Sequence, residues 1–200
     1  MLILASKSPA RNALLAGAGV RFAASPATID ERGLEASEVG KGGDAGAVAR
    51  ALAEAKALAV ARANRGALVI GADQVLALGA ELLHKPLDMA AAAAQLARLR
   101  GRTHSLLAAV ALARDGEVIW SHVERADLTM RDVSDAERDR ILELEGPQIL
   151  GSVGAYRLEG PSIQLFERIE GDYFTILGLP LLPLLAALRR HGPELLEGFT

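Results

Sequence analysis

The residues best suited to chemistry gather where the first predicted strand leads into the first predicted helix. Residues 2–5 form an apolar run typical of a short buried strand, and Ser6 and Ser8 follow it with hydroxyls suited to helix capping. Lys7 and Arg11 add positive charge to the free N–H groups of the helix start, and this combination binds phosphate. Simple helix capping also accounts for the two hydroxyls, and the glycine spacing of a Walker A loop is absent.

A second group of candidates is spread along the first half of the chain. Residues 68–73 predict a central strand that ends in Asp73, at the strand terminus where open α/β sheets place ligands, although a turn aspartate is the alternative. Lys56 and Lys85 suit a polyphosphate, and each alone is typical of an ordinary surface lysine. Glu31 and Asp73 suit a divalent cation and an activated water, since Mg²⁺ prefers one or two carboxylates together with substrate phosphates.

The composition excludes several other chemistries. The 200 residues contain no cysteine, which excludes a thiol nucleophile, a disulfide scaffold and the usual zinc-finger ligands. The four histidines lack the spacing of a metal site, and a formal net charge of −3 argues against a nucleic-acid polymer as partner. The N-terminus does not resemble a signal peptide and no apolar stretch is long enough to span a membrane, so we expect a cytoplasmic protein.

The order of the expected elements predicts an α/β (α+β) fold. Expected strands alternate with helices, with a hairpin at Asp115-Gly116 and a capping box at Ser134–Glu137. The expected strands are residues 2–5, 20–24, 68–73, 105–114, 117–128 and 165–169, and the expected helices are residues 11–18, 44–63, 88–100, 134–146 and 180–191. The glycine-rich residues 30–46 are expected to form a mobile loop. We predict a mixed, strongly twisted sheet whose flanking helices form two lobes around a central cleft, in a single domain over 1–192 with a flexible tail over 193–200.

Several collinear motifs resemble the Maf family of nucleoside triphosphate pyrophosphatases over residues 2–190. The matching segments are 4–11 (Leu-Ala-Ser-Lys-Ser-Pro-Ala-Arg), 30–31, 50–57, 71–75 (Gly-Ala-Asp-Gln-Val), 85–86, 101–104 (Gly-Arg-Thr-His), 154–156 (Gly-Ala-Tyr), 167–171 and 178–180 (Gly-Leu-Pro). The resemblance implies a Maf-like fold, a divalent metal (Mg²⁺ or Mn²⁺), a homodimer, and hydrolysis of a nucleoside triphosphate to the monophosphate and pyrophosphate. It implies that Asp73 is the proton acceptor and, with Glu31, a metal ligand, while the triphosphate is held by Ser6, Ser8, Arg11, Lys56 and Lys85.

Three positions differ between branches of this family. The branch acting on dTTP and UTP carries Arg, Thr and Gln where this chain has Ala10, Gln74 and Glu159. Gln74 with Glu159 resembles the branch acting on 7-methyl-GTP, because a carboxylate can accept hydrogen bonds from guanine and favours a cationic base. The alternatives are a dTTP/UTP-type enzyme, an inosine or xanthosine triphosphate enzyme of the house-cleaning type, and a non-catalytic nucleotide-sensing regulator of cell division.

Overall fold

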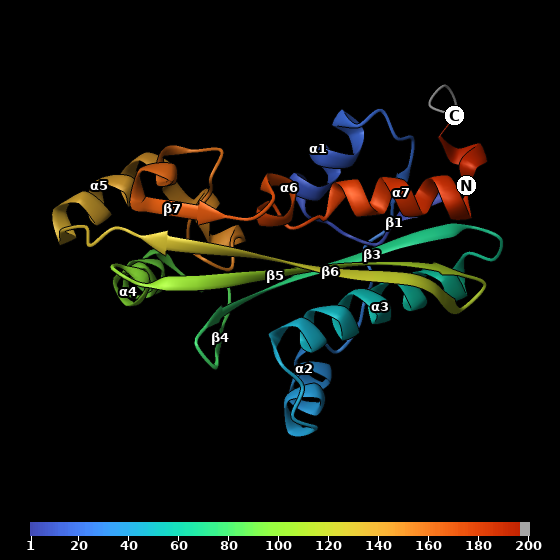
Figure 1. Ribbon diagram of the computed structural model, residues 1–200, viewed down its shortest axis with the longest axis horizontal. Helices are drawn as coiled ribbons and strands as arrows, with labels where there is room; N and C mark the ends of the chain where they lie inside the picture. The colour runs from blue at the N-terminus through green and yellow to red at the C-terminus, as the bar shows by residue number, and fades with distance from the viewer. Residues whose placement is uncertain (197–200) are drawn as a thin grey trace. The chain divides into compact units, whose positions relative to one another are not determined.

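The structure is a computed structural model that describes residues 1–196 (Figure 1). It is an α/β protein with a mixed seven-stranded sheet in the order β2-β1-β3-β5-β6-β7, and β4 pairs with β3. The strands are β1 (Leu2–Leu4), β2 (Ala23–Ala24), β3 (Leu68–Leu78), β4 (Glu81–Leu83), β5 (Thr103–Arg114), β6 (Glu117–Met130) and β7 (Phe166–Glu170). β1 runs parallel to β2 and β3, whereas the β3–β4 and β6–β7 pairs are antiparallel.

The helices expected from the sequence are present at close to their expected residues. The helices of the structure are α1 (Pro9–Gly17), α2 (Glu31–Gly40), α3 (Ala45–Ala63), α4 (Met89–Leu99), α5 (Asp135–Glu145), α6 (Tyr173–Ile176) and α7 (Leu181–His191), with 3₁₀ helices at Gly146–Gly151, Pro161–Leu165 and Pro193–Leu195. None of the helices described over residues 1–196 is long and apolar enough to cross a membrane.

The contacts divide the chain into two compact units. Unit 1 contains residues 1–74, 108–124 and 172 onward, and unit 2 contains residues 75–107 and 125–171. Strands β3, β5 and β6 each contribute residues to both units. Each unit is described by itself below.

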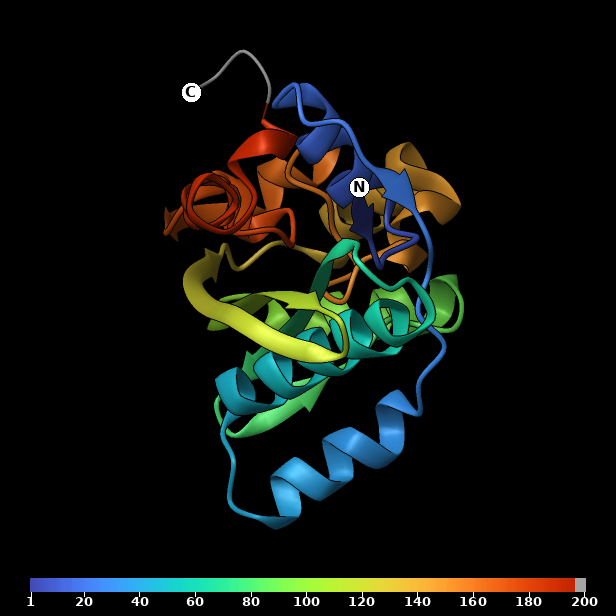
Figure 2. The ribbon, with the colours of Figure 1, turned by 90° about the vertical axis from the view of Figure 1, so that its right-hand side faces the viewer.

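In unit 1, the two faces of β3 meet different helices. Leu68, Ile70 and Ala72 are buried in a cluster with leucines of α1 and α7. Gly71 faces the opposite way, towards α3, where a Cβ would lie 2.1 Å from the carbonyl oxygen of Ala53. Figures 1 and 2 show α3 on one side of the strands, with α1 and α7 on the other. Because side chains alternate along a strand, Asp73 shares the α3 side with Gly71.

The predicted hairpin between β5 and β6 is confirmed. Asp115 and Gly116 have φ values of +51° and +86°. Positive φ at both central residues is the requirement of a two-residue type I′ turn, which Asp-Gly meets. The turn is tied to the loop after α3, because the N–H of Gly66 donates to Asp115 Oδ1 at 2.8 Å.

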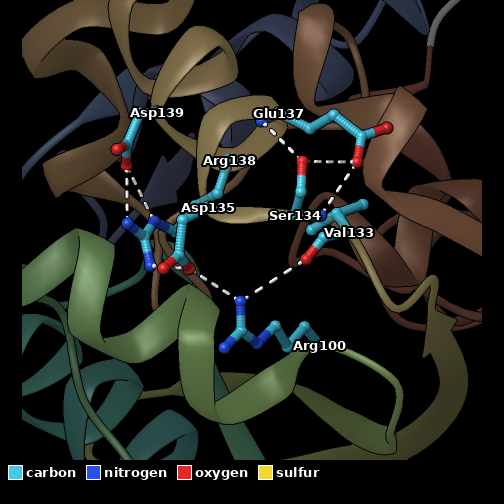
Figure 3. A network of polar contacts seen from close by, with 7 residues as sticks. All are labelled: Arg100, Val133, Ser134, Asp135, Glu137, Arg138 and Asp139. Atoms are coloured by element: carbon cyan, nitrogen blue, oxygen red, sulfur yellow. Dashed lines mark hydrogen bonds and ion pairs between the residues drawn. The ribbon is translucent and has the colours of Figure 1, made fainter.

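In unit 2, the predicted capping box at the start of α5 is confirmed. The N–H of Glu137 donates to Ser134 Oγ at 3.2 Å, and the N–H of Ser134 donates to Glu137 Oε2 at 2.8 Å. Arg100, directly after α4, donates to Asp135 Oδ1 at 2.7 Å and to the carbonyl of Val133 (Figure 3). These contacts fasten the start of α5 to the end of α4.

The prediction of a loop over residues 30–46 was wrong for most of the segment, because Glu31–Gly40 form α2 and α3 begins at Ala45. Asp30 caps α2 by accepting from the N–H of Gly33 at 2.9 Å, and Glu31 places a favourable negative charge in the first turn. Of the glycines that suggested a loop, Gly33 and Gly40 lie within α2, Gly42 (φ +82°) and Gly43 follow it, and Gly46 lies in the first turn of α3. α2 packs against α3 although none of its residues is fully buried, so packing of one side offsets its low helix propensity.

The C-terminal segment was predicted to be flexible from residue 193. Pro193–Leu195 forms a short 3₁₀ helix, and Leu196 is buried in the core cluster of unit 1. The remainder of that prediction, residues 197–200, lies outside the described residues.

Candidate functional site

The start of α1 has the architecture expected from the sequence. Ser8 is the N-cap, and its Oγ accepts from the N–H of Arg11. Ser6 lies between β1 and α1 and is 7% exposed, with its Oγ accepting from the N–H of Ser8 at 3.2 Å. Both hydroxyls therefore brace the turn that delivers the N-terminus of α1, and the expected plain capping role is present.

Arg11 extends from α1 into the interior of unit 1. Its Nε donates to the carbonyl oxygen of Gly178 at 2.8 Å, and its Nη1 donates to the carbonyl oxygen of Ala72 at 3.0 Å. Burial lowers the pKa of Arg11, while the negative charges of Asp73 and Glu31 oppose that shift. The guanidinium thus joins α1 to β3 and to the turn after α6, and places a positive charge close to two carboxylates.

Asp73, Lys56 and Glu31 form one ionic cluster. Lys56 Nζ lies 2.5 Å from Asp73 Oδ1 and 2.9 Å from Glu31 Oε1. The side chains of Lys56 and Asp73 are only 12% and 11% exposed, whereas that of Glu31 is 55% exposed. β3 turns Asp73 towards α3, α3 presents Lys56, and the first turn of α2 supplies Glu31. Three of the candidate residues singled out in the sequence therefore converge here, although the helix that carries Glu31 was not anticipated.

Asp73 does not lie at the end of its strand, which corrects the sequence-based expectation. β3 continues for five residues beyond it, to Leu78, and Asp73 is the sixth of the strand's eleven residues. The strand continues because residues 75–78 are apolar and buried in unit 2. The backbone of Asp73 is therefore part of a strand that continues on both sides of it, which orders the carboxylate more than a turn would.

The donor set at this cluster fits a divalent metal completed by a substrate. Glu31 and Asp73 both contact Lys56 Nζ, so the two carboxylates that could ligate a cation lie on either side of one ammonium group. Among residues 1–196 no group of three or more His, Asp or Glu side chains is arranged to hold a metal. Two carboxylates with remaining positions filled by phosphate oxygens and water are what Mg²⁺ prefers.

Gln74 faces away from this cluster and is anchored to α6. Its Nε2 donates to the carbonyl oxygens of Thr175 and Ile176 at 3.0 and 2.9 Å. Both partners can only accept, so Nε2 must face them and Oε1 is the atom left to meet a ligand. Ala10 lies in the first turn of α1, directly before Arg11, and is partly buried.

Lys85 and Glu159 belong to unit 2. Lys85 is exposed between β4 and α4. Glu159 is exposed and its Oε1 accepts from Arg157 Nε at 3.4 Å, while the same arginine lies 3.8 Å from the buried Glu145. Glu145 also accepts from the N–H and Oγ of Ser162 at 2.9 and 2.7 Å. A buried carboxylate therefore fixes the segment that presents Glu159.

The structure also assigns contacts to residues that the sequence analysis left without a role. Thr175 is fully buried, and its Oγ1 donates to Glu124 Oε2 at 2.8 Å. In unit 2, His104 Nε2 lies 2.8 Å from the hydroxyl of Tyr156, and both side chains are buried. Each of these pairs joins residues at least 51 positions apart, so no local pattern could have revealed them.

The fold and the ionic cluster define an α/β protein with an enclosed carboxylate, a partly buried arginine and a helix N-terminus in one unit. The sequence matches the family of Maf-like proteins over residues 1–191. The chain belongs to that family, which confirms the resemblance drawn from its motifs.

Bacterial relatives are similar over almost their whole length. The chain is 56% identical over 190 residues to a 7-methyl-GTP pyrophosphatase of Brucella abortus, covering 95% of this chain and 96% of the relative. It is 57% identical over 192 residues to a 7-methyl-GTP pyrophosphatase of Rhizobium meliloti, covering 96% of each. A nucleoside triphosphate pyrophosphatase of Bradyrhizobium diazoefficiens is 54% identical over 189 residues, with 94% and 92% covered.

Proposed function

We propose that this chain is a nucleoside triphosphate pyrophosphatase, which hydrolyses its substrate to a nucleoside monophosphate and pyrophosphate. The observation that carries the proposal is the Asp73–Lys56–Glu31 cluster beside the partly buried Arg11. It combines a fixed carboxylate with cationic groups, as hydrolysis of a phosphoanhydride requires. The names of relatives more than 50% identical over nearly the whole chain support the same activity.

Asp73 is the proposed general base. It accepts a proton from a water molecule whose oxygen attacks the α-phosphorus, and the bond between that phosphorus and the pyrophosphate oxygen breaks. Oδ1 contacts Lys56, so Oδ2 is the oxygen assigned to the water. A positioned base contributes a factor on the order of 10² to 10⁴ to the rate.

The cationic groups bind the triphosphate and offset the charge that develops on the leaving pyrophosphate. Lys56 and Lys85 supply ammonium groups, and Arg11 supplies a guanidinium that is held in place by the carbonyl oxygens of Gly178 and Ala72. The backbone N–H groups at the start of α1, braced by Ser6 and Ser8, add the favourable field of a helix N-terminus.

Glu31 and Asp73 are the residues proposed to hold a divalent cation, Mg²⁺ or Mn²⁺, which when bound supplies charge neutralisation at the phosphates. Two carboxylates fill only part of the coordination shell of the cation, so binding of the cation depends on oxygens of the substrate. Metal binding without nucleotide should therefore be weak.

The proposed base preference is for a guanine-type triphosphate such as 7-methyl-GTP. Oε1 of Gln74 can accept from a ligand donor, and the carboxylate of Glu159 can accept from guanine and favours a cationic base. Glu159→Gln should lower the ratio of kcat/KM for 7-methyl-GTP to that for UTP. An unchanged ratio would remove Glu159 from recognition, and a preference for dTTP and UTP in the unaltered protein would support the alternative branch. The proposal further includes a cytoplasmic location and a homodimer.

The proposal is tested with a panel of canonical, methylated and deaminated triphosphates assayed for pyrophosphate with Mg²⁺, with Mn²⁺ and with a chelator. Release of pyrophosphate that requires the metal is the expected result. Tight nucleotide binding without turnover of any member would instead favour a nucleotide-sensing regulator.

A further inference from the structure

Three side chains from three different elements converge on the short helix α6 and the turn that follows it. Gln74 of β3 binds the carbonyl oxygens of Thr175 and Ile176. Arg11 of α1 binds the carbonyl oxygen of Gly178. Glu124 of β6 accepts from the hydroxyl of Thr175. All belong to unit 1, and two of the three side chains that reach this segment are ones to which the proposed function gives a role.

α6 is too short to hold its own position. It has four residues, and its first turn is capped by Asp172, whose Oδ1 accepts from the N–H of Phe174 at 3.1 Å. A helix of this length has little intrinsic stability, so side-chain contacts must fix where its carbonyl groups point. Thr175 is the residue of α6 that makes such a contact, because its side chain is fully buried and its hydroxyl donates to Glu124.

Gly178 packs closely against the side chains of Arg11 and Gln74. Its φ of +93° favours glycine, and a Cβ there would lie 3.4 Å from Arg11 Nε and 3.5 Å from Gln74 Oε1. The carbonyl of Thr175 accepts from the N–H of Gly178 at 3.0 Å as well as from Gln74. A shift of Thr175 would therefore be passed to both Gln74 and Arg11.

We propose that Thr175, held by Glu124, is a positioning residue that sets the orientation of Gln74 and Arg11 for the substrate. This inference rests on the proposed function, because it assigns Thr175 to the same site. Without the hydroxyl, the carbonyl groups of α6 are no longer fixed, and both side chains lose their preferred geometry. In the proposed function Gln74 recognises the base, which is bound alike before and during reaction, and Arg11 keeps its second anchor on the carbonyl oxygen of Ala72, so the loss should affect binding more than turnover.

The test compares Thr175→Val, which removes only the hydroxyl, with Thr175→Ser, which retains it. In steady-state hydrolysis of the preferred triphosphate, Thr175→Val should raise KM at least about fivefold and leave kcat within about twofold, as expected for uniform binding. Thr175→Ser and Glu124→Gln, which retain a donor and an acceptor, should stay within about twofold of the unaltered protein, whereas Glu124→Met should reproduce Thr175→Val. Thr129→Val is the matched control, because its hydroxyl pairs with Thr103 on the surface of unit 2.

A binding measurement separates this inference from the proposed function. Calorimetry with the α,β-methylene analogue of the triphosphate reports affinity without turnover, and Thr175→Val should weaken it by the same factor. If the unaltered protein hydrolyses no triphosphate, the proposed function fails, while a weakened affinity in Thr175→Val still supports the positioning role. If Thr175→Val melts at a lower temperature but keeps its KM and its affinity, Thr175 is only structural and the inference is overturned. Should Thr175→Val not fold, an unchanged KM in Glu124→Met overturns it equally.

Discussion

Lys56 Nζ donates to Asp73 Oδ1 at 2.5 Å, and both side chains are nearly enclosed by the protein. The same ammonium also contacts Glu31, so one cation joins β3, α3 and α2. Removing a charged group from water is costly unless it is paired, and Asp73 meets that condition through Lys56. The pair therefore offsets the cost of enclosing the carboxylate that is proposed as the base.

Asp73→Asn should abolish cleavage of the triphosphate while leaving the protein folded. The amide matches the carboxylate in size and can still accept from Lys56, but it cannot take a proton from water. Loss of a general base predicts a fall in kcat of at least about 10²-fold. The measurement is pyrophosphate release, with circular dichroism to verify folding. Near-normal turnover by a well-folded variant would show that another group accepts the proton.

Lys56→Met should destabilise the protein as well as weaken triphosphate binding. It leaves the enclosed carboxylate of Asp73 without its cation, and breaking such a pair costs on the order of 3 kcal/mol. The double variant Lys56→Met/Asp73→Asn should recover part of this loss, because the uncompensated charge is gone. Urea denaturation measures the free energies of unfolding. Lys41→Met is the matched control, since Lys41 pairs with Glu38 at the surface and should change stability little. Additive effects of the two site substitutions would mean that Lys56 and Asp73 do not interact energetically.

Local patterns predicted the elements that depend on local physics. The cap at Ser8, the capping box at Ser134 and the Asp115-Gly116 hairpin are all confirmed, because each depends on residues within four positions of one another. The α2 segment was missed because its glycines lower helix propensity, while the packing against α3 that stabilises it is a tertiary contact that helix propensity does not include. An Asp30-Glu31 pair at a helix start was the signal available for it.

Gly71→Ala should destabilise the protein severely. A Cβ at Gly71 would lie 2.1 Å from the carbonyl oxygen of Ala53 and 2.6 Å from the backbone nitrogen of Ala57, so strand or helix must move. Overpacking against backbone predicts a loss of at least about 3 kcal/mol. Thermal unfolding measures the loss, and Gly17→Ala is the control, because nothing lies within 4 Å of a Cβ there. A melting temperature equal to that of the unaltered protein would contradict the close packing of α3 on β3.

His104 should make the protein less stable in acid. Burial lowers the pKa of His104 from 6.5 to about 4, with the charge of Asp127 opposing the shift. Between pH 6.5 and 4 the unfolded chain binds a proton that the folded protein does not, so stability is full above pH 6.5 and falls as the pH approaches 4. The loss from this group is roughly 3 kcal/mol. His104→Gln should flatten the pH dependence of the unfolding free energy over this range, and an equally steep dependence in the variant would exclude His104 as its source.

The sequence indicated which residues gather at the candidate site better than it indicated how those residues are arranged. Residue types and motifs selected Asp73, Lys56, Glu31 and Arg11, and the structure brings these four together. The sequence could not show that Arg11 is anchored by the carbonyl groups of Ala72 and Gly178, because backbone acceptors carry no sequence signal. For the same reason the support of Gln74 by α6 emerged only from the structure.

The central claim is attack of water on the α-phosphorus of a nucleoside triphosphate, with Asp73 as base. Hydrolysis in water labelled with oxygen-18, followed by mass spectrometry of both products, tests it most directly. We predict one labelled oxygen in the nucleoside monophosphate, unlabelled pyrophosphate, and no labelled product from Asp73→Asn. Label in the pyrophosphate, or formation of orthophosphate and a nucleoside diphosphate, would contradict the account.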